Sequence, residues 1–229
     1  MNGKIFVIEG VDASGKESQS KALFQRLIED GLDVIRLSFP DYESDSSALV
    51  KMYLAGDFGK DPQAVTPYVA STFYAADRFA SYTTKWKEHY AHGGIVIADR
   101  YTTANMVHQA SKIDDAREKL AFLDWLWNLE YEIYAIPKPD KVFFLDMPPE
   151  ISFKLMKARE NKITGDQAKD IHEKDTAYLL RSYENAHFVS EHYSWNIISC
   201  VDANQSLKTI ENISDEIYEQ VKTYLNANA

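Results

Sequence analysis

Short apolar runs alternate with longer amphipathic segments along the chain, a pattern typical of strands that alternate with helices. The runs rich in Val, Ile and Phe predict five buried strands: Lys4–Ile8, Asp33–Phe39, Ile95–Asp99, Lys141–Asp146 and Asn196–Cys200. Strands separated by helices tend to pair in parallel, and helices then cover both faces of the sheet. The pattern therefore predicts an α/β fold built on a five-stranded parallel sheet.

Helical periodicity fills most of the sequence between these strands. In the first predicted helix, Lys16–Asp30, apolar residues repeat at a spacing of four, and Gly31 follows as a stop signal. The other predicted helices are Thr66–Ala91, Thr103–Ser111, Asp114–Ile133 and Pro149–Arg159. The polar segment Glu160–Asp170 lies between two helices. We interpret it as a mobile loop, spanning about residues 157–172, within a single domain of residues 1–229.

Composition narrows the classes of function. The 229 residues carry a net charge of −10, which argues against general nucleic-acid binding but allows a local basic pocket. No apolar run approaches the roughly 18 residues of a membrane span, and the apolar run at the N-terminus predicts a strand rather than a signal peptide. The single cysteine, Cys200, excludes an internal disulfide and a cysteine-cluster metal site. We expect a cytoplasmic protein.

A glycine-rich segment connects the first strand to the first helix. The spacing of Gly10, Gly15 and Lys16 is that of a P-loop, in which backbone N–H groups and the lysine bind phosphate oxygens. The residue after the lysine is normally Ser or Thr, whose hydroxyl binds Mg²⁺. Here that residue is Glu17, and a hydroxyl follows only at Ser18. The expected fold is therefore a P-loop three-layer sandwich with an altered metal position.

Polar residues follow every predicted strand, and ligands of open parallel sheets bind at the carboxyl ends of the strands. Asp99 and Arg100 end the third predicted strand. A carboxylate at this position can hold Mg²⁺ through a water molecule, and the arginine can bind a second phosphate. The other strand ends carry Glu9, Pro40-Asp41-Tyr42, Asp146 and Asp202. We expect all of these residues to share one rim.

An aromatic residue and an arginine, Tyr74 and Arg78, lie four residues apart on one predicted helix face. The ring can stack on a base while the guanidinium bonds a carbonyl or a phosphate. Alternatively, a tyrosine on an amphipathic helix simply belongs to the core. His108 lies near the expected rim and is a candidate for contact with substrate.

Taken in order, these motifs resemble the thymidylate (dTMP) kinase family over nearly the whole chain. The matching segments are Glu9-Gly10-Val11-Asp12-Ala13-Ser14-Gly15-Lys16, Phe39-Pro40, Tyr74-Ala75-Ala76-Asp77-Arg78, Asp99-Arg100-Tyr101 with Gln109, Leu145–Glu150, and Val201-Asp202-Ala203. The aspartate inside the P-loop is the more specific feature, because most P-loop proteins lack it. The resemblance implies transfer of the ATP γ-phosphoryl group to dTMP, with Mg²⁺ as cofactor, by a homodimer.

The resemblance also implies roles for individual residues. The expected catalytic residues are Lys16, Arg100, Asp12 and Arg159, of which Arg159 lies at the start of the lid. ATP is expected to contact Gly10, Asp12, Ala13, Ser14, Gly15, Lys16, Glu17, Ser18, Arg159, Asp202, Ala203 and Gln205. The monophosphate is expected to contact Asp12, Phe39, Pro40, Tyr42, Tyr74, Arg78, Arg100, Tyr101, Asn105, His108 and Gln109. Metal ligands are expected among Asp99, Glu17 and Ser18.

The sequence departs from the family pattern at several of these positions. Tyr42 stands where many members carry an arginine, Ala104 where a Ser or Thr is common, and the lid offers only Arg159 with nearby lysines. Glu17 has two open roles, as a direct or water-mediated Mg²⁺ ligand or as a solvent-facing residue at the helix start. Two other functions also stay open, a deoxynucleoside or other deoxynucleotide kinase and a catalytically weak nucleotide-binding protein.

Overall fold

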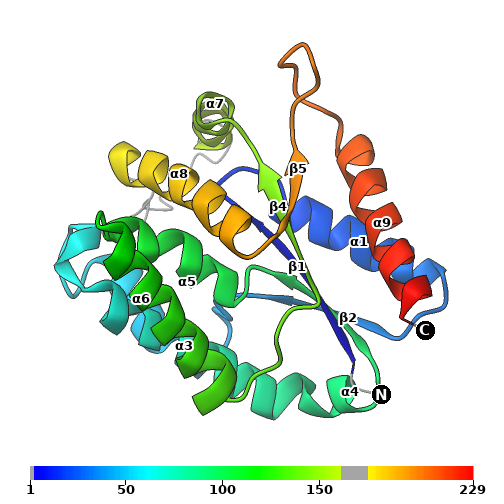
Figure 1. Cartoon of the computed structure of the whole chain (residues 1–229), viewed down its shortest axis with the longest axis horizontal. Helices are drawn as coiled ribbons and strands as arrows, with labels where there is room; N and C mark the ends of the chain where they lie inside the picture. The colour runs from blue at the N-terminus through cyan, green and yellow to red at the C-terminus, as the bar shows by residue number, and fades with distance from the viewer. Residues whose placement is uncertain (1–2, 161–174, 229) are drawn as a thin grey trace.

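The computed structural model describes residues 3–160 and 175–228, with only the backbone for residues 158–160 (Figure 1). Its strands are β1 (Lys4–Gly10), β2 (Val34–Ser38), β3 (Ile95–Asp99), β4 (Lys141–Asp146) and β5 (Asn196–Ser199). Its helices are α1 (Lys16–Glu29), α2 (Ala48–Ala55), α3 (Pro67–Ser81), α4 (Lys87–Ala91), α5 (Thr102–His108), α6 (Ala116–Trp127), α7 (Pro149–Glu160), α8 (Thr176–His192) and α9 (Ile210–Ala227).

The five strands form one parallel sheet in the order β2-β3-β1-β4-β5. The first strand lies at its centre, with Ile8 level with Asp99 on one side and Gly10 level with Leu145 on the other. Parallel strands in this register end at a common edge, so the loops that follow them converge. The predicted fold class and sheet are confirmed, and β3 and β4 have the predicted bounds.

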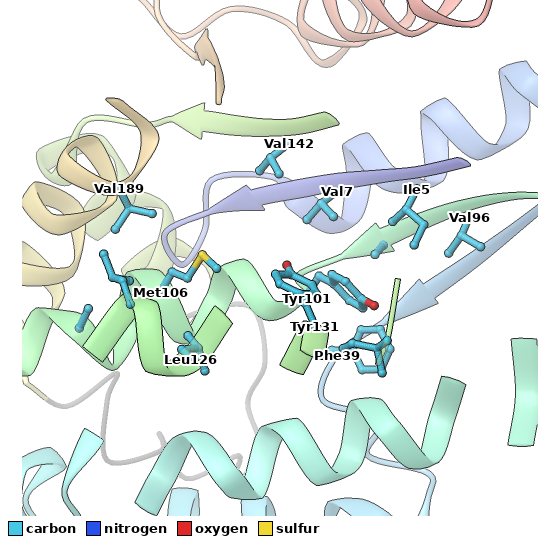
Figure 2. Packing of buried hydrophobic residues seen from close by; sticks show 14 of the residues in the cluster. Ile5, Val7, Phe39, Val96, Tyr101, Met106, Leu126, Tyr131, Val142 and Val189 are labelled. Atoms are coloured by element: carbon cyan, nitrogen blue, oxygen red, sulfur yellow. The ribbon is translucent and has the colours of Figure 1, made fainter. Parts of the chain in front are cut away.

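Helices cover both faces of the sheet (Figure 1), and an apolar layer lies between the helices and the sheet on each face. On one face, Ile5, Val7, Val96 and Val142 pack toward the helices α5, α6 and α8 (Figure 2). On the other face, the alternate strand residues pack against α1 and α9. Successive side chains of a strand point to opposite faces, and both faces are covered, which explains why the central strands β1, β3 and β4 read as nearly continuous apolar runs.

The helices differ from the predicted pattern in two ways. The long helix expected over Thr66–Ala91 is a run of α3, a π-helical turn at Tyr82–Trp86 and α4. The helix expected over Asp114–Ile133 likewise ends in a π-helical turn, Asn128–Ile133. A π turn adds one residue and shifts the face that the helix buries, which periodicity alone does not reveal. Among the described helices, none is long and apolar enough to cross a membrane.

The packing of α9 on the sheet provides a test of the core. Ile217 is fully buried in the layer that α9 shares with α1, whereas Ile210 begins the same helix and is 54% exposed. We expect Ile217→Ala to lower the free energy of unfolding by about 2–5 kcal/mol, because it leaves a cavity. Ile210→Ala should change that free energy by less than about 0.5 kcal/mol. Urea denaturation measures both values, and equal losses in the two variants would contradict this packing.

Candidate active site

The P-loop is a tight turn between β1 and α1, and its glycines are required by geometry. Gly15 has a φ of 90°, in the left-handed region that glycine can adopt because it has no side chain to clash. A Cβ on Gly10 would lie 2.5 Å from Ser14 Oγ, so a larger residue would push the loop open. Ala13 also adopts a left-handed φ, of 56°. Ala13 thus adopts a backbone conformation that is uncommon for a residue with a side chain, in the loop where the P-loop pattern expects phosphate.

Lys16 begins α1, and its side chain folds back over the loop. Its ammonium donates a hydrogen bond of 2.8 Å to the carbonyl oxygen of Val11, and the residue is only 8% exposed. Burial and the positive charge of Arg100 together lower the pKa of Lys16 to about 8, although the nearby carboxylates partly oppose this shift. The lysine is thus held beside the loop in a state that a bound anion would stabilise.

Arg100 follows β3 with a φ of 63° and reaches across to the P-loop. Its Nη2 lies 2.5 Å from Asp12 Oδ1, and its Nη1 lies 2.6 Å from His108 Nε2. Because a guanidinium only donates, His108 Nε2 accepts, and the imidazole in this arrangement is neutral. Burial lowers the pKa of Arg100. The attraction of the Asp12 and Glu9 carboxylates is stronger than this effect, so the pKa of Arg100 is raised overall.

Two buried carboxylates, Glu9 and Asp99, lie near Lys16 and Arg100 and stabilise their positive charges. Glu9 is fully buried, accepts a hydrogen bond from Thr103 Oγ1 at 2.6 Å, and lies 3.9 Å from Arg100. Asp99 is 7% exposed and contributes attraction to both Lys16 and Arg100. The site therefore holds two fixed cations beside a loop of backbone N–H groups, which is an arrangement suited to two phosphate groups.

The loop after β2 lies beside this cluster. Phe39 is buried against Tyr101, with 5.8 Å between the ring centroids, and the Phe39–Pro40 peptide is cis. Tyr42 is 51% exposed, and its carbonyl accepts a hydrogen bond from Lys51 at 3.2 Å. Tyr101 is 1% exposed and donates its hydroxyl to the Pro137 carbonyl at 2.9 Å, so its ring is part of the core.

The pair predicted to read a base lies on α3, and its members have different environments. Tyr74 is half-buried and meets the ring of Tyr53 edge-on, with 6.4 Å between centroids. Arg78 is 1% exposed and binds the Glu130 carboxylate through two hydrogen bonds of 2.6 Å. The structure thus adds a buried counter-ion that the sequence interpretation lacked. Contact of Tyr74 and Arg78 with a base stays a prediction.

Three more predicted substrate residues come from α5 and its C-cap. Asn105 is 2% exposed, and its amide donates to the Ser71 carbonyl at 3.2 Å. Gln109 is 1% exposed. His108 is half-buried, contacts Arg100 and stacks on Tyr178, with ring centroids 6.3 Å apart. Of these residues, His108 contacts Arg100 directly, and contact of all three with substrate stays a prediction.

The two residues after Lys16 face outward. Glu17 is exposed and pairs with Lys21 at 2.6 Å, one helical turn along α1. Ser18 is also exposed. This geometry favours the solvent-facing role of Glu17 over the role of metal ligand.

The loop after β5 turns at the same edge of the sheet. Asp202 Oδ1 accepts the backbone N–H groups of Asn204 and Ser206, and Gln205 has a φ of 61°. Ala203 lies exposed in this turn. The side chain of Arg159 and residues 161–172 of the lid expected at about 157–172 lie outside the described residues, and residues 157–160 belong to α7.

Two residues that shape the site were not predicted from the sequence. Ser152 on α7 donates to the Asp12 carbonyl at 2.6 Å and ties that helix to the P-loop. Glu130 is fully buried between the apolar residues Leu126 and Tyr131. The sequence feature that could have identified it is an acidic residue on the otherwise apolar face of the predicted helix Asp114–Ile133.

Comparison with known proteins agrees with this geometry. The family model for thymidylate kinase matches residues 8–217. A thymidylate kinase from Exiguobacterium is 27% identical over 96% of this chain and 94% of its own length, and one from Plasmodium falciparum is 26% identical over 96% and 90%. A solved thymidylate kinase structure from Candida albicans has a TM-score of 0.70 at 20% identity and covers 98% of this chain and 93% of its own.

The similarity to the Candida albicans structure shows the fold alone. The family model matches the sequence itself, including the P-loop, Arg100 and most of the remaining chain. The relatives match over almost their full lengths, so the similarity is not confined to a shared nucleotide-binding motif. This chain therefore belongs to the thymidylate kinase family of ATP-dependent nucleoside monophosphate kinases.

Proposed function

We propose that this protein transfers the γ-phosphoryl group of ATP to dTMP, giving dTDP and ADP, with Lys16 and Arg100 holding the two phosphate chains. The observation that carries the proposal is the contact between Arg100 and Asp12, which joins the end of β3 to the P-loop. Two cations that follow the adjacent strands β1 and β3 and lie beside one loop suit a donor phosphate and an acceptor phosphate. Phosphoryl transfer depends chiefly on such positioning and on charge neutralisation.

Each cation has a separate role in this proposal. Lys16 exchanges the Val11 carbonyl for the β- and γ-phosphate oxygens of ATP, and the loop N–H groups bind the remaining oxygens. Arg100 keeps one N–H on Asp12 and turns others to the phosphate of dTMP. The ring of Tyr74 stacks on the base. The turn at 202–205 frames the adenine through backbone groups, and Arg159 neutralises the transferring group from the lid.

Magnesium fits this site through Asp99 rather than through Glu17. Asp99 is buried at the end of β3, where its charge acts on Lys16, while Glu17 pairs with Lys21 in solvent. In the described ranges, no cluster of three or more His, Cys, Asp or Glu side chains could hold a metal ion. Asp99 would therefore hold Mg²⁺ mainly through water, and phosphate oxygens would complete its ligands. Bound there, Mg²⁺ neutralises charge on the donor phosphates.

The proposal extends to assembly and compartment. Apolar side chains remain exposed on α2 and α3: Leu49, Met52, Val69 and Phe79 are each at least 40% exposed. Such a face fits a homodimer built from helices, because a second copy would remove it from water. The buried free Cys200 fits the reducing cytoplasm, where no disulfide is expected.

A substrate panel tests the reaction itself. With ATP and Mg²⁺, a coupled assay of ADP release should show dTMP to be a better acceptor than dAMP, dGMP or thymidine, because Tyr74 and Arg78 are expected to bind a single pyrimidine ring and Arg100 requires a phosphate. Lys16→Ala should abolish turnover and leave the thermal midpoint near that of the wild type. Lys21→Ala, which changes an exposed lysine of the same helix, serves as the control. A preference for thymidine would instead indicate a deoxynucleoside kinase, and no turnover a nucleotide-binding protein.

Removing the Arg100 guanidinium should damage the acceptor site selectively. A charge-assisted phosphate contact is worth about 1.5–3 kcal/mol, so Arg100→Ala should raise the KM for dTMP by roughly tenfold to a hundredfold. The KM for ATP should change by less than about threefold, because Lys16 remains. Arg26→Ala, which removes a surface pair with Asp215, should leave both constants unchanged. Equal losses for dTMP and ATP would show that Arg100 has only a structural role.

The lowered pKa of Lys16 predicts how ATP binding depends on pH. Phosphates stabilise the charged ammonium, and the pKa of about 8 means that the lysine is mostly charged at pH 7 and mostly neutral at pH 9. ATP affinity should therefore fall by about tenfold between these pH values, with uptake of close to one proton per site at pH 9. Titration calorimetry in two buffers of different ionisation enthalpy measures both effects. Affinity that stays constant over this range would refute the role given to Lys16.

A further inference from the structure

Glu130 is a fully buried carboxylate that the reaction scheme above does not use. It lies in the π-helical turn Asn128–Ile133, directly after α6, and it is 0% exposed. The turn is anchored by a hydrogen bond between Tyr131 and Thr102 of α5. Both residues to which Glu130 binds, Arg78 and Asn105, belong to the proposed base site. A single carboxylate thus connects two side chains that come from different helices.

The contact with Arg78 fixes the plane of the guanidinium. Nε of Arg78 donates to Oε2 of Glu130, and Nη2 donates to Oε1, both at 2.6 Å. Nη1 donates to the carbonyl of Tyr101 at 3.2 Å. These bonds use three of the five N–H groups, so one donor remains on each Nη atom. With the plane of the guanidinium fixed, these two remaining donors can point only within that plane.

The contact with Asn105 fixes the orientation of its amide. Nδ2 of Asn105 donates to Oε1 of Glu130 at 3.4 Å and to the Ser71 carbonyl at 3.2 Å. Both acceptors are oxygens, so the reversed amide would place Oδ1 against them and would be repelled. Both amide hydrogens are then committed, and the atom that Asn105 can offer to a ligand is the acceptor Oδ1.

The resulting pattern is a donor from Arg78 beside an acceptor from Asn105. Thymine offers the complementary edge, since its O4 accepts and its N3–H donates. Cytosine offers the opposite edge, since its exocyclic amine donates and its N3 accepts. A mismatched edge leaves buried polar groups unpaired, and this is the strongest source of selectivity between molecules of similar shape.

We propose that Glu130 is the positioning residue that sets the base selectivity of this enzyme, by holding Arg78 and Asn105 in the donor and acceptor arrangement that thymine requires. This inference rests on the proposed function, because it assumes that the base lies against α3 and α5. Burying a charged pair adds little stability compared with an apolar pair of similar volume. The retention of three polar side chains in contact at this depth therefore fits a role in recognition better than a role in stability.

The test compares Glu130→Gln with Glu132→Gln. Glu132 lies in the same turn, is 57% exposed, and pairs only with Lys138 among its described ion pairs. Glutamine keeps the size of Glu130 but presents an N–H₂ group where an acceptor is needed, which disturbs either Arg78 or Asn105. We expect Glu130→Gln to raise the KM for dTMP at least tenfold and to lower the ratio of kcat/KM for dTMP over dCMP at least tenfold. The KM for ATP should stay within threefold of the wild type, and Glu132→Gln should match the wild type in every constant.

A structural role would give a different result. If Glu130 served the fold alone, folded Glu130→Gln would lose activity on both monophosphates equally and keep the wild-type ratio, and this outcome would overturn the inference. Should Glu130→Gln not fold, Glu130→Asp keeps the counter-ion of Arg78 but is one methylene too short to reach both partners. A lowered dTMP to dCMP ratio in that variant supports the inference, and a wild-type ratio overturns it. Wild-type protein that does not phosphorylate dTMP would instead refute the proposed function itself.

Discussion

The ion pair between Asp12 and Arg100 is the contact on which the rest of the site depends. Asp12 belongs to the loop after β1, and Arg100 follows β3, so the pair joins two chain segments 88 residues apart. The parallel register makes this possible, because Ile8 is level with Asp99 and the N–H of Arg100 donates to the Ile8 carbonyl at 3.1 Å. The left-handed φ of Arg100 then directs the side chain back over the P-loop rather than along the strand.

Charge balance explains how such a cluster is stable before any phosphate binds. Three carboxylates, Glu9, Asp12 and Asp99, surround two cations, Lys16 and Arg100, at a depth where an unpaired charge would be costly. The carboxylates raise the pKa of Arg100, whereas burial leaves Lys16 with a lowered pKa. The two cations therefore differ in kind. Arg100 is permanently charged and prearranged, while Lys16 gains its full charge most readily when phosphate arrives.

The features that depend on a local sequence pattern could be predicted from the sequence alone. Apolar runs identified all five strands, and the spacing of Gly10, Gly15 and Lys16 identified the P-loop in its correct place. The helices α2 and α9 were not predicted, and two π-helical turns interrupt what reads as regular periodicity. The membership of the family was correctly predicted from motifs that lie far apart in the chain.

Features that depend on long-range contacts could not be predicted in the same way. Nothing local to Arg78 indicates that Glu130, 52 residues later, will be its counter-ion. The direction of Glu17 was equally open, because a carboxylate at the start of a helix can turn toward phosphate or toward a lysine one turn along. The Arg78–Glu130 pair depends on tertiary packing, and the direction of Glu17 depends on which of two possible partners it binds. Neither is fixed until the chain has folded.

A double-mutant cycle of Asp12→Asn and Arg100→Ala, followed through kcat/KM for dTMP, is the most direct test of the central ion pair. If Asp12 acts by holding Arg100 in place, the double variant should be no slower than Arg100→Ala alone, with a coupling energy of at least about 1.4 kcal/mol. Losses that simply add would contradict the account, because they would show that the two residues bind the substrates independently of each other.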